Sequence, residues 1–199
     1  MKKEFTDVLK ARRTHYALNK EIQVSDEAIQ SLLEDAVLHT PSAFNSQSAR
    51  VVLLLNGKHD TLWSITREAL RKIVPAESFK PTDDKINAFA AAYGTVLFFE
   101  DTAVVKGLQE AFPLYQHNFP IWSTESSGML QYVVWSGLAA QGVGASLQHY
   151  NELIEENVKE TFDLPETWKL VAQMPFGNPV APLREKEFLP LDGRLLVQA

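Results

Sequence analysis

The run Val51-Val52-Leu53-Leu54-Leu55 constrains the fold of this chain more than any other stretch. It is continuously apolar rather than alternating, which predicts a strand that is buried on both faces of a sheet. Two further strands are predicted over residues 95–99 and 169–174, and helical patterns separate the three. This order predicts an α+β fold, or an α/β fold with mixed strand pairing.

The stretch just before this run, residues 40–50, is dense in side-chain amides and hydroxyls. A helix that Ser25 caps is predicted to end before it, because Pro41 stops the apolar stripe. Amides and hydroxyls suit the edge of a planar heteroaromatic ligand, since they donate and accept hydrogen bonds in fixed directions. The same residue types also serve turn geometry in an ordinary helix-to-strand loop. Both interpretations stay open from this stretch alone.

Composition excludes several classes of protein. The net charge of −6 argues against nucleic acid as the main partner, because neutralising phosphates needs a basic face. The chain has no cysteine, which removes disulfides, thiol catalysis and thiolate metal sites. The first residues lack the apolar region of a signal peptide, and no apolar run approaches the roughly 20 residues of a membrane helix. We expect a cytoplasmic protein whose 199 residues form a single domain.

Three other segments each allow a plain and a functional interpretation. Arg12-Arg13-Thr14 follows a predicted first helix, where the arginines complement the helix dipole or form an anion site. The aromatic segment 113–122 is a packed loop, or a mobile wall over a flat ligand. Residues 123–141 predict a helix that is apolar all round and therefore central and buried; it is a core helix alone, or a core helix that is also used in a dimer interface.

Motifs for direct protein chemistry are missing. The histidines show no metal-ligand spacing, and the sequence has no nucleophile elbow and no Walker loop. The glycine loop, residues 142–149, lacks the third glycine of a dinucleotide fingerprint. Glu100 and Asp101 face opposite ways at a strand end, which argues against a catalytic dyad. Binding groups without an acid, base or nucleophile indicate that a bound cofactor supplies the chemistry.

Four segments occur in a characteristic order along nearly the whole chain. They are Arg12-Arg13-Thr14, Pro41-Ser42-Ala43-Phe44-Asn45-Ser46-Gln47, Gly142-Val143-Gly144-Ala145-Ser146-Leu147-Gln148-His149-Tyr150-Asn151, and Phe176-Gly177 with Lys186. Together they resemble the nitroreductase family, and most closely its short bacterial and fungal branch, labelled fatty-acid repression mutant or copper-induced nitroreductases. The chain departs from the broader family at Tyr16, Leu18 and Ser48-Ala49.

The resemblance implies a mixed, mainly antiparallel sheet flanked by helices, in an intertwined homodimer with two FMN molecules at the interface. The tail, about residues 187–199, is expected to dock on the partner subunit. The residues implied to hold the phosphate, ribityl and pyrimidine side of FMN are Arg12, Arg13 and Thr14, with Arg184 and Lys186 reaching the phosphate. Those implied to come from the other subunit are Ser42, Asn45 and Gln47. Those implied to lie along the ring are Leu147, Gln148 and His149.

The resemblance also implies the chemistry. NAD(P)H reduces FMN, leaves, and a nitroaromatic or quinone takes the electrons in the same pocket, in a ping-pong scheme. No side chain acts as a catalyst and no metal is expected. The expected substrate wall consists of Phe112, Tyr115, Phe119 and Trp122. One alternative is a flavin-binding regulatory or sensory protein with little turnover, and another is a dimer that binds a different phosphorylated ligand.

Overall fold

A sheet with the strand order β1-β5-β3-β2 forms the centre of the computed structural model, which describes residues 4–198. The strands are β1 (Leu18–Asn19), β2 (Ala49–Leu55), β3 (Gly94–Asp101), β4 (Gly144–Ala145) and β5 (Trp168–Pro179), with β4 paired to β5. Every strand pairing in the described residues is antiparallel; one parallel bridge joins Thr14 to Ala145 outside the strands. The predicted α+β class and mainly antiparallel sheet are therefore confirmed. Residues 1–3 and 199, which the predicted domain and tail include, lie outside the described residues.

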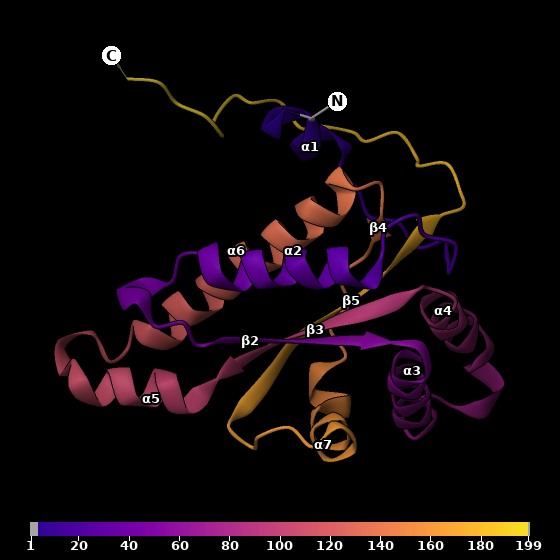
Figure 1. The fold of residues 1–199 in the computed structure, drawn as a ribbon, viewed down its shortest axis with the longest axis horizontal. Helices are drawn as coiled ribbons and strands as arrows, with labels where there is room; N and C mark the ends of the chain where they lie inside the picture. Colours follow the sequence, from indigo (N-terminus) through magenta and orange to yellow (C-terminus); the bar gives the residue numbers. More distant parts are fainter. Residues whose placement is uncertain (1–3, 199) are drawn as a thin grey trace.

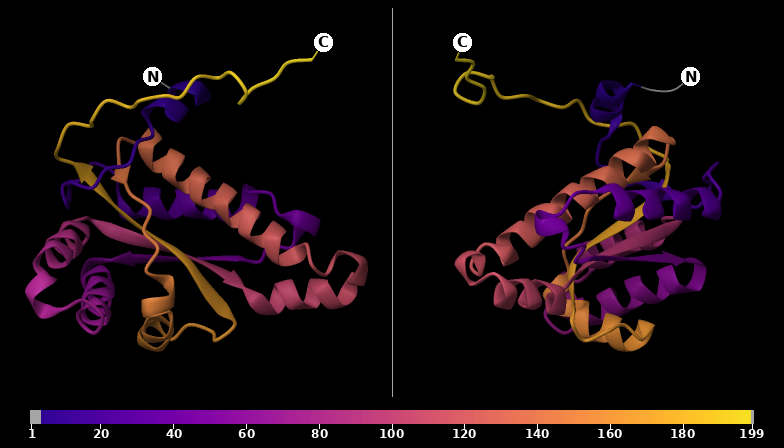
Figure 2. Two further views of the ribbon diagram at one scale, coloured as in Figure 1. Left: turned by 180° about the vertical axis from the view of Figure 1, so that it is seen from behind. Right: turned by 60° about the vertical axis from the view of Figure 1, so that its left-hand side comes forward.

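Helices cover both faces of the sheet (Figures 1 and 2). The helix bounds are α1 (Phe5–Ala11), α2 (Asp26–His39), α3 (Asn56–Arg71), α4 (Lys80–Ala90), α5 (Thr102–Ala111), α6 (Phe119–Ala140) and α7 (Asn151–Phe162). Short 3-10 turns occupy Ala43–Asn45, Ala76–Ser78 and Pro113–Tyr115. Ser25 caps α2 as predicted, since its hydroxyl accepts a hydrogen bond from the Ala28 N–H at 3.2 Å.

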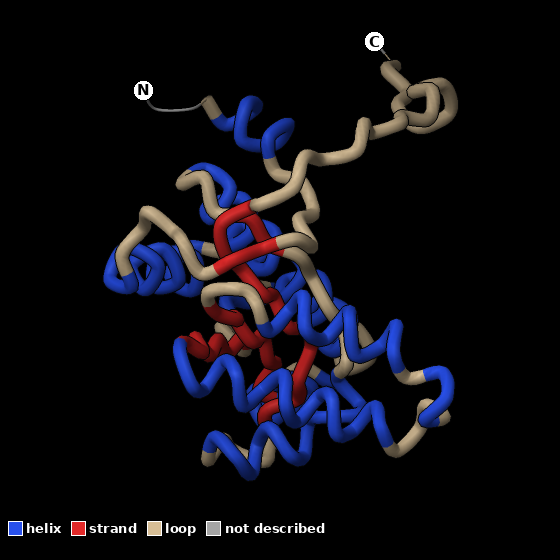
Figure 3. Tube along the Cα trace, turned by 90° about the vertical axis from the view of Figure 1, so that its right-hand side faces the viewer, coloured by secondary structure: helices blue, strands red, loops and turns tan. Residues whose placement is uncertain are grey.

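Strand β3 separates two hydrophobic cores, because alternate residues of a strand point to opposite faces. Val96 and Phe98 pack with α2 and α6 in one core. Leu97 and Phe99 pack with α3, α4 and α7 in the other. The tube in Figure 3 shows the strands enclosed between these helical layers.

The run 51–55 is less buried than its composition predicts. It lies in β2, which is an edge strand, and within β2 only Leu54 is fully buried. The prediction of a strand buried on both faces is therefore wrong for the single chain. Helix α6 likewise leaves Met129, Tyr132 and Val133 about two-fifths exposed, at 44%, 40% and 41%.

Helix α6 also begins earlier than predicted, at Phe119 instead of residue 123. Pro120 lies in its first turn, where a missing N–H removes no helical hydrogen bond. Part of the expected aromatic loop is therefore helical. After β5 the chain forms no helix or strand as far as residue 198. The first part of this tail lies beside α1, and its end extends away from it (Figures 2 and 3). Among the described residues, no helix is both long and apolar enough to cross a membrane.

Gly177 provides a test of the close packing between β5 and β1. A Cβ atom at this position would lie 2.5 Å from the Asn19 carbonyl oxygen and 3.1 Å from the Tyr93 nitrogen. Because both are backbone atoms, we expect Gly177→Ala to lower the free energy of unfolding by about 1–3 kcal/mol. Urea denaturation followed by circular dichroism measures the change.

The matched control is Gly107→Ala in α5, where a Cβ meets nothing within 4 Å. This substitution should raise the free energy of unfolding by about 0.5–1 kcal/mol, since alanine favours a helix interior. Equal effects of the two substitutions would contradict the packing argument.

Candidate functional site

The predicted phosphate-binding cations gather where α1 ends. The Arg13 guanidinium donates a 2.7 Å hydrogen bond to the Arg184 carbonyl, which ties the tail to this end of the chain. The Arg12 guanidinium lies 4.4 Å from the centre of the Trp135 ring on α6. A hollow of about 550 Å³, here called the cationic hollow, is lined by Leu9, Lys10, Arg12, Arg13, Leu183, Arg184, Glu185, Lys186 and Phe188. The structure thus brings all four predicted cations to one place.

The glycine loop lies against this cationic segment. Thr14 forms a bridge with Ala145, and the His15 N–H donates to the Ala145 carbonyl at 3.0 Å. A Cβ at Gly144 would lie 2.7 Å from the Pro179 ring and 3.0 Å from the His15 ring, so glycine lets these segments approach closely. Burial, and then the charges of Arg13 and Arg12, lower the pKa of His15. The part of this lowering that the two arginines cause reflects a positive local charge, which favours an anion.

The end of the glycine loop is attached to β5. Gln148 and Gln173 exchange two backbone hydrogen bonds, of 2.7 and 2.9 Å. The Gln148 amide is buried and donates to the Ser146 hydroxyl at 3.0 Å. Leu147 is partly buried against the core and His149 is exposed. The Gln148 N–H already donates to the Gln173 carbonyl. A backbone N–H that donates to a ligand's ring at this loop therefore has to belong to a neighbouring residue.

The second group of predicted residues lies in the polar loop, residues 40–48. Phe44, Asn45 and Gln47 have left-handed φ angles of 56°, 51° and 49°. Such angles are uncommon outside glycine and persist only where surrounding bonds hold them. The Ser42 hydroxyl accepts from the Gln47 N–H at 3.0 Å, and the Arg50 guanidinium donates to the Gln47 carbonyl at 2.7 Å. The loop is therefore held in one shape, and the exposed Asn45 and Gln47 side chains are presented on its surface.

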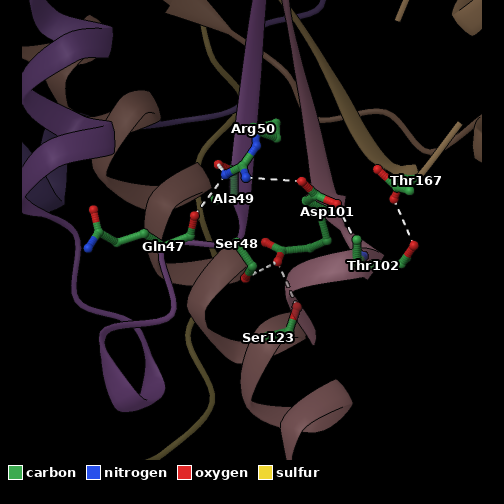
Figure 4. A network of polar contacts seen from close by, with 10 residues as sticks. Gln47, Ser48, Ala49, Arg50, Asp101, Thr102, Ser123 and Thr167 are labelled. Carbon is green, nitrogen blue, oxygen red and sulfur yellow. Dashed lines mark hydrogen bonds and ion pairs between the residues drawn. The ribbon is translucent and has the colours of Figure 1, made fainter. Parts of the chain in front are cut away.

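Two carboxylates at the end of β3 support this loop (Figure 4). Asp101 pairs with Arg50 at 3.0 Å and so fixes the guanidinium that holds the loop. Glu100, 6% exposed, accepts hydrogen bonds of 2.6 Å from the hydroxyls of Ser48 and Ser123. Burial raises the pKa of Glu100, against the lowering effect of the two serine hydrogen bonds and of Arg50. Sequence reasoning rejected this pair as a dyad and missed its role as a support.

The expected aromatic wall gathers around Phe44, a residue that sequence reasoning did not single out. The ring centres of Phe112, Tyr115, Phe119 and Trp122 lie 4.9, 5.8, 5.3 and 6.0 Å from that of Phe44. Phe119 is only 3% exposed, whereas Phe44, Phe112 and Tyr115 are 50%, 40% and 44% exposed. The accessible part of the wall is therefore formed by these last three residues, with Trp122 stacked behind Phe44.

The two groups lie at opposite ends of α6. Trp122 and Ser123 adjoin the polar loop near its first turn, whereas Trp135 contacts Arg12 near its last. Thirteen residues separate Trp122 from Trp135, which corresponds to about 20 Å along the helix axis. One chain therefore carries two separate groups of predicted site residues rather than one closed site. Within residues 4–198, no group of three or more histidine or acidic side chains is placed to hold a metal ion.

The fold brings together side chains of the kind that can bind a flat, phosphorylated group: cations at one end of α6, and amides and aromatic rings at the other. The model of the nitroreductase family matches residues 9–178, and the chain belongs to that family of oxidoreductases. HBN1 of Saccharomyces cerevisiae is 36% identical over 190 residues, covering 94% of each chain. Nitroreductase FRM2 of the same yeast is 30% identical over 187 residues, covering 93% of each.

Solved structures agree with this assignment. Nitroreductase CinD from Lactococcus lactis, in complex with chloramphenicol, has a TM-score of 0.91 at 43% identity, covering 98% of this chain and 100% of CinD. Its complex with 4-nitrophenol has a TM-score of 0.90. A protein from Desulfovibrio desulfuricans in complex with FMN shares the fold, with a TM-score of 0.71 at 19% identity, covering 100% of this chain and 99% of its own.

The Arg50–Asp101 pair allows a direct test of how the polar loop is held. Asp101→Asn keeps the cap of α5, since an amide oxygen can still accept from the Ala103 N–H, but it removes the charge opposite Arg50. The pair is largely buried, with 29% and 14% of the two side chains exposed. We expect a loss of about 1–2 kcal/mol in the free energy of unfolding. Urea denaturation measures this loss.

Asp84→Asn is the matched control, because its pair with Lys80 has side chains 83% and 59% exposed. An exposed pair contributes roughly 0–1 kcal/mol, so we expect little change. A loss at residue 84 as large as that at 101 would show that burial does not decide the strength of these pairs.

Proposed function

We propose that this protein is an FMN-dependent oxidoreductase that uses NAD(P)H to reduce nitroaromatics or quinones. The observation that carries the proposal is the pair of complementary half-sites on one chain: a cationic hollow, and an amide-bearing loop beside exposed aromatic rings. A phosphate matches the first and a flat ring system matches the second. The absence of a nucleophile from the set fits chemistry supplied by a cofactor.

The donor set fits FMN group by group. The cationic hollow would hold the phosphate through Arg12, Arg13, Arg184 and Lys186, because charge-assisted hydrogen bonds are the strong ones. Thr14 would contact the polar middle of the cofactor. Leu147 and His149 would border the ring, with Gln148 holding their loop to β5. When bound, FMN accepts a hydride from NAD(P)H and passes the electrons to the second substrate.

The partner chain would supply the other half. In this proposal Ser42, Asn45 and Gln47 of a second copy approach the ring held mainly by the first copy. Phe44 and the aromatic wall then border the space where the acceptor lies. The complexes of CinD with chloramphenicol and 4-nitrophenol, both nitroaromatic compounds, support this substrate class.

A homodimer is part of the same proposal. Large apolar side chains are exposed on α1, on α2 and along the tail, among them Phe5 (72%), Leu38 (72%) and Phe188 (77%). Exposed apolar side chains in such numbers favour an interaction surface. A hollow of about 620 Å³ between α2 and the edge strand β2 is also lined mainly by apolar side chains. We propose that a second copy, including its tail, covers these surfaces.

The decisive experiment is the visible absorption spectrum of the purified protein, followed by NADH oxidation with a quinone acceptor. We expect a flavin spectrum and turnover that depends on both substrates. A colourless protein that takes up no added FMN would overturn the proposal. Flavin-loaded protein with negligible turnover would favour a flavin-binding regulatory role instead.

Arg12→Ala tests the cationic hollow. A lost charge-assisted hydrogen bond to phosphate corresponds to about 1.5–3 kcal/mol, so we expect FMN affinity to fall roughly tenfold to a hundredfold. Titration of the apoprotein with FMN, followed by flavin fluorescence, measures the affinity. Lys72→Ala, at the end of α3 and outside the hollow, should leave it unchanged.

Dilution tests the shared site. Because each flavin would contact two chains, dissociation of the dimer should release it, and the flavin fluorescence should rise at the same protein concentration at which the mass halves. Analytical ultracentrifugation and fluorescence on one dilution series compare the two transitions. Flavin retained by a monomer would contradict a site shared between chains.

A further inference from the structure

One buried oxygen atom joins the two elements that border the acceptor side of the proposed pocket. Glu100 Oε2 accepts from the Ser48 hydroxyl and from the Ser123 hydroxyl, both at 2.6 Å (Figure 4). Ser48 directly follows Gln47 of the polar loop, and Ser123 directly follows Trp122 of the aromatic wall. The distance between loop and wall is thus bridged through a single carboxylate.

The bridge joins the loop that carries Phe44 to the helix that carries Trp122, and the rings of these two residues stack. Phe44 belongs to the polar loop, and its ring lies 6.0 Å from Trp122 with the planes 19° apart. Its ring also lies 5.3 Å from Phe119, edge to face. If the bridge loosens, the loop and α6 can separate, and the exposed aromatic surface changes shape.

A buried glutamate lowers the stability of the fold if its role is only to link two elements. Its Oε1 atom is buried and makes no hydrogen bond in the part of the chain that the structure describes. A buried carboxylate with one unpaired oxygen is destabilising, and a neutral side chain of similar size is often better tolerated. Asp101 and Arg50 hold the same loop from outside, through the Gln47 carbonyl. The polar loop would therefore remain attached to β2 and β3 without Glu100. The bridge through Glu100 adds a defined spacing between this loop and α6.

We propose that Glu100 is a positioning residue that sets the spacing between the polar loop and the aromatic wall, and thereby the affinity for the aromatic electron acceptor. The proposal rests on the proposed function, because it assigns a role within the same pocket. Glu100 touches neither cofactor nor acceptor in this assignment and acts through Ser48 and Ser123.

Protonation should weaken the bridge. Protonation, like the substitution Glu100→Gln, removes the negative charge, so the remaining oxygen accepts from both hydroxyls more weakly, and the new donor at the other oxygen has no partner among the described residues. The charged groups around Glu100 are Arg50 of β2 and Asp101 of β3, while Lys106 of α5 and Lys169 of β5 line the adjoining hollow of about 440 Å³. Helix α6 faces the carboxylate with Ser123. Burial raises the pKa of Glu100, so that its carboxylate takes up a proton at a higher pH than that of an ordinary glutamate.

The test compares Glu100→Gln with wild-type holoprotein. We expect KM for nitrobenzene to rise about tenfold, since small displacements of positioning groups have effects of this order. FMN content, the rate of flavin reduction by NADH and turnover with ferricyanide, which needs no aromatic wall, should stay unchanged. In the wild type KM for nitrobenzene should rise as the pH falls, and in the variant it should be high at every pH.

Two further variants separate positioning from stability. Ser123→Ala removes the bond to α6 without changing a charge and should reproduce the rise in KM. Glu125→Gln, an exposed glutamate on the same helix, should behave as the wild type. Removing the buried charge should leave the melting temperature of Glu100→Gln at pH 8 equal to or above that of the wild type. At lower pH the difference should vanish, because the raised pKa means that the folded protein takes up the proton more readily than the unfolded chain.

Hydrogen exchange provides a measurement that needs neither flavin nor turnover. The Gln47 N–H, which donates to Ser42, should exchange about tenfold faster in Glu100→Gln at pH 8, because local opening exposes it. Unchanged exchange, or an unchanged KM and pH profile, would overturn the proposal. Equal losses with nitrobenzene and ferricyanide, together with a lower melting temperature, would show a structural role and overturn it too. Wild-type protein without flavin or turnover refutes the proposed function instead, and the exchange experiment then still decides the role of Glu100.

Discussion

The antiparallel pairing of β3 with β5 is the interaction on which the rest of the molecule depends. Both strands lie inside the sheet, and their side chains alternate between the two helical layers. A change of register by one residue would turn each side chain toward the opposite core, and because both cores are packed, the size and shape of the side chains fix the pairing. Helices on each face then follow, because each layer must cover one apolar surface of the sheet.

Strand β3 links the core to the candidate site, because its last two residues contact the polar loop. Glu100 is the last residue of β3 that points inside, and Asp101 is the first at the rim. Each side chain holds the polar loop from a different direction, one through Ser48 and the other through Arg50. The left-handed residues of the loop are therefore held through side chains at the end of a buried central strand.

Sequence patterns predicted those parts of the molecule that depend on neighbours along the chain. The cap of α2 at Ser25 and the presence of strand β3 follow from local signals. The burial of residues 51–55 was predicted wrongly because their apolar side chains lie on an edge strand, where a single chain supplies only part of the cover. The role of Glu100 was missed because its partner Ser48 lies 52 residues away and serines carry no distinctive pattern. The site residues came from ordered motifs, whereas Phe44 became visible only through its ring contacts.

Helix α6 explains why the two half-sites belong to different pockets in the proposed homodimer. It joins Trp122, in the aromatic wall, to Trp135, against Arg12, and a helix of this length is nearly rigid. The spacing within one chain is therefore constant, and in the proposed homodimer the shape of each pocket would depend on how the two chains meet. The side chains that α6 leaves exposed would take part in that interface, together with those of α1, α2 and the tail. Substitutions at Met129, Tyr132 or Val133 should then alter the cofactor and acceptor sides together, although none of these residues lies in either half-site. Glu100 acts within one chain, so its effect falls on the acceptor side alone.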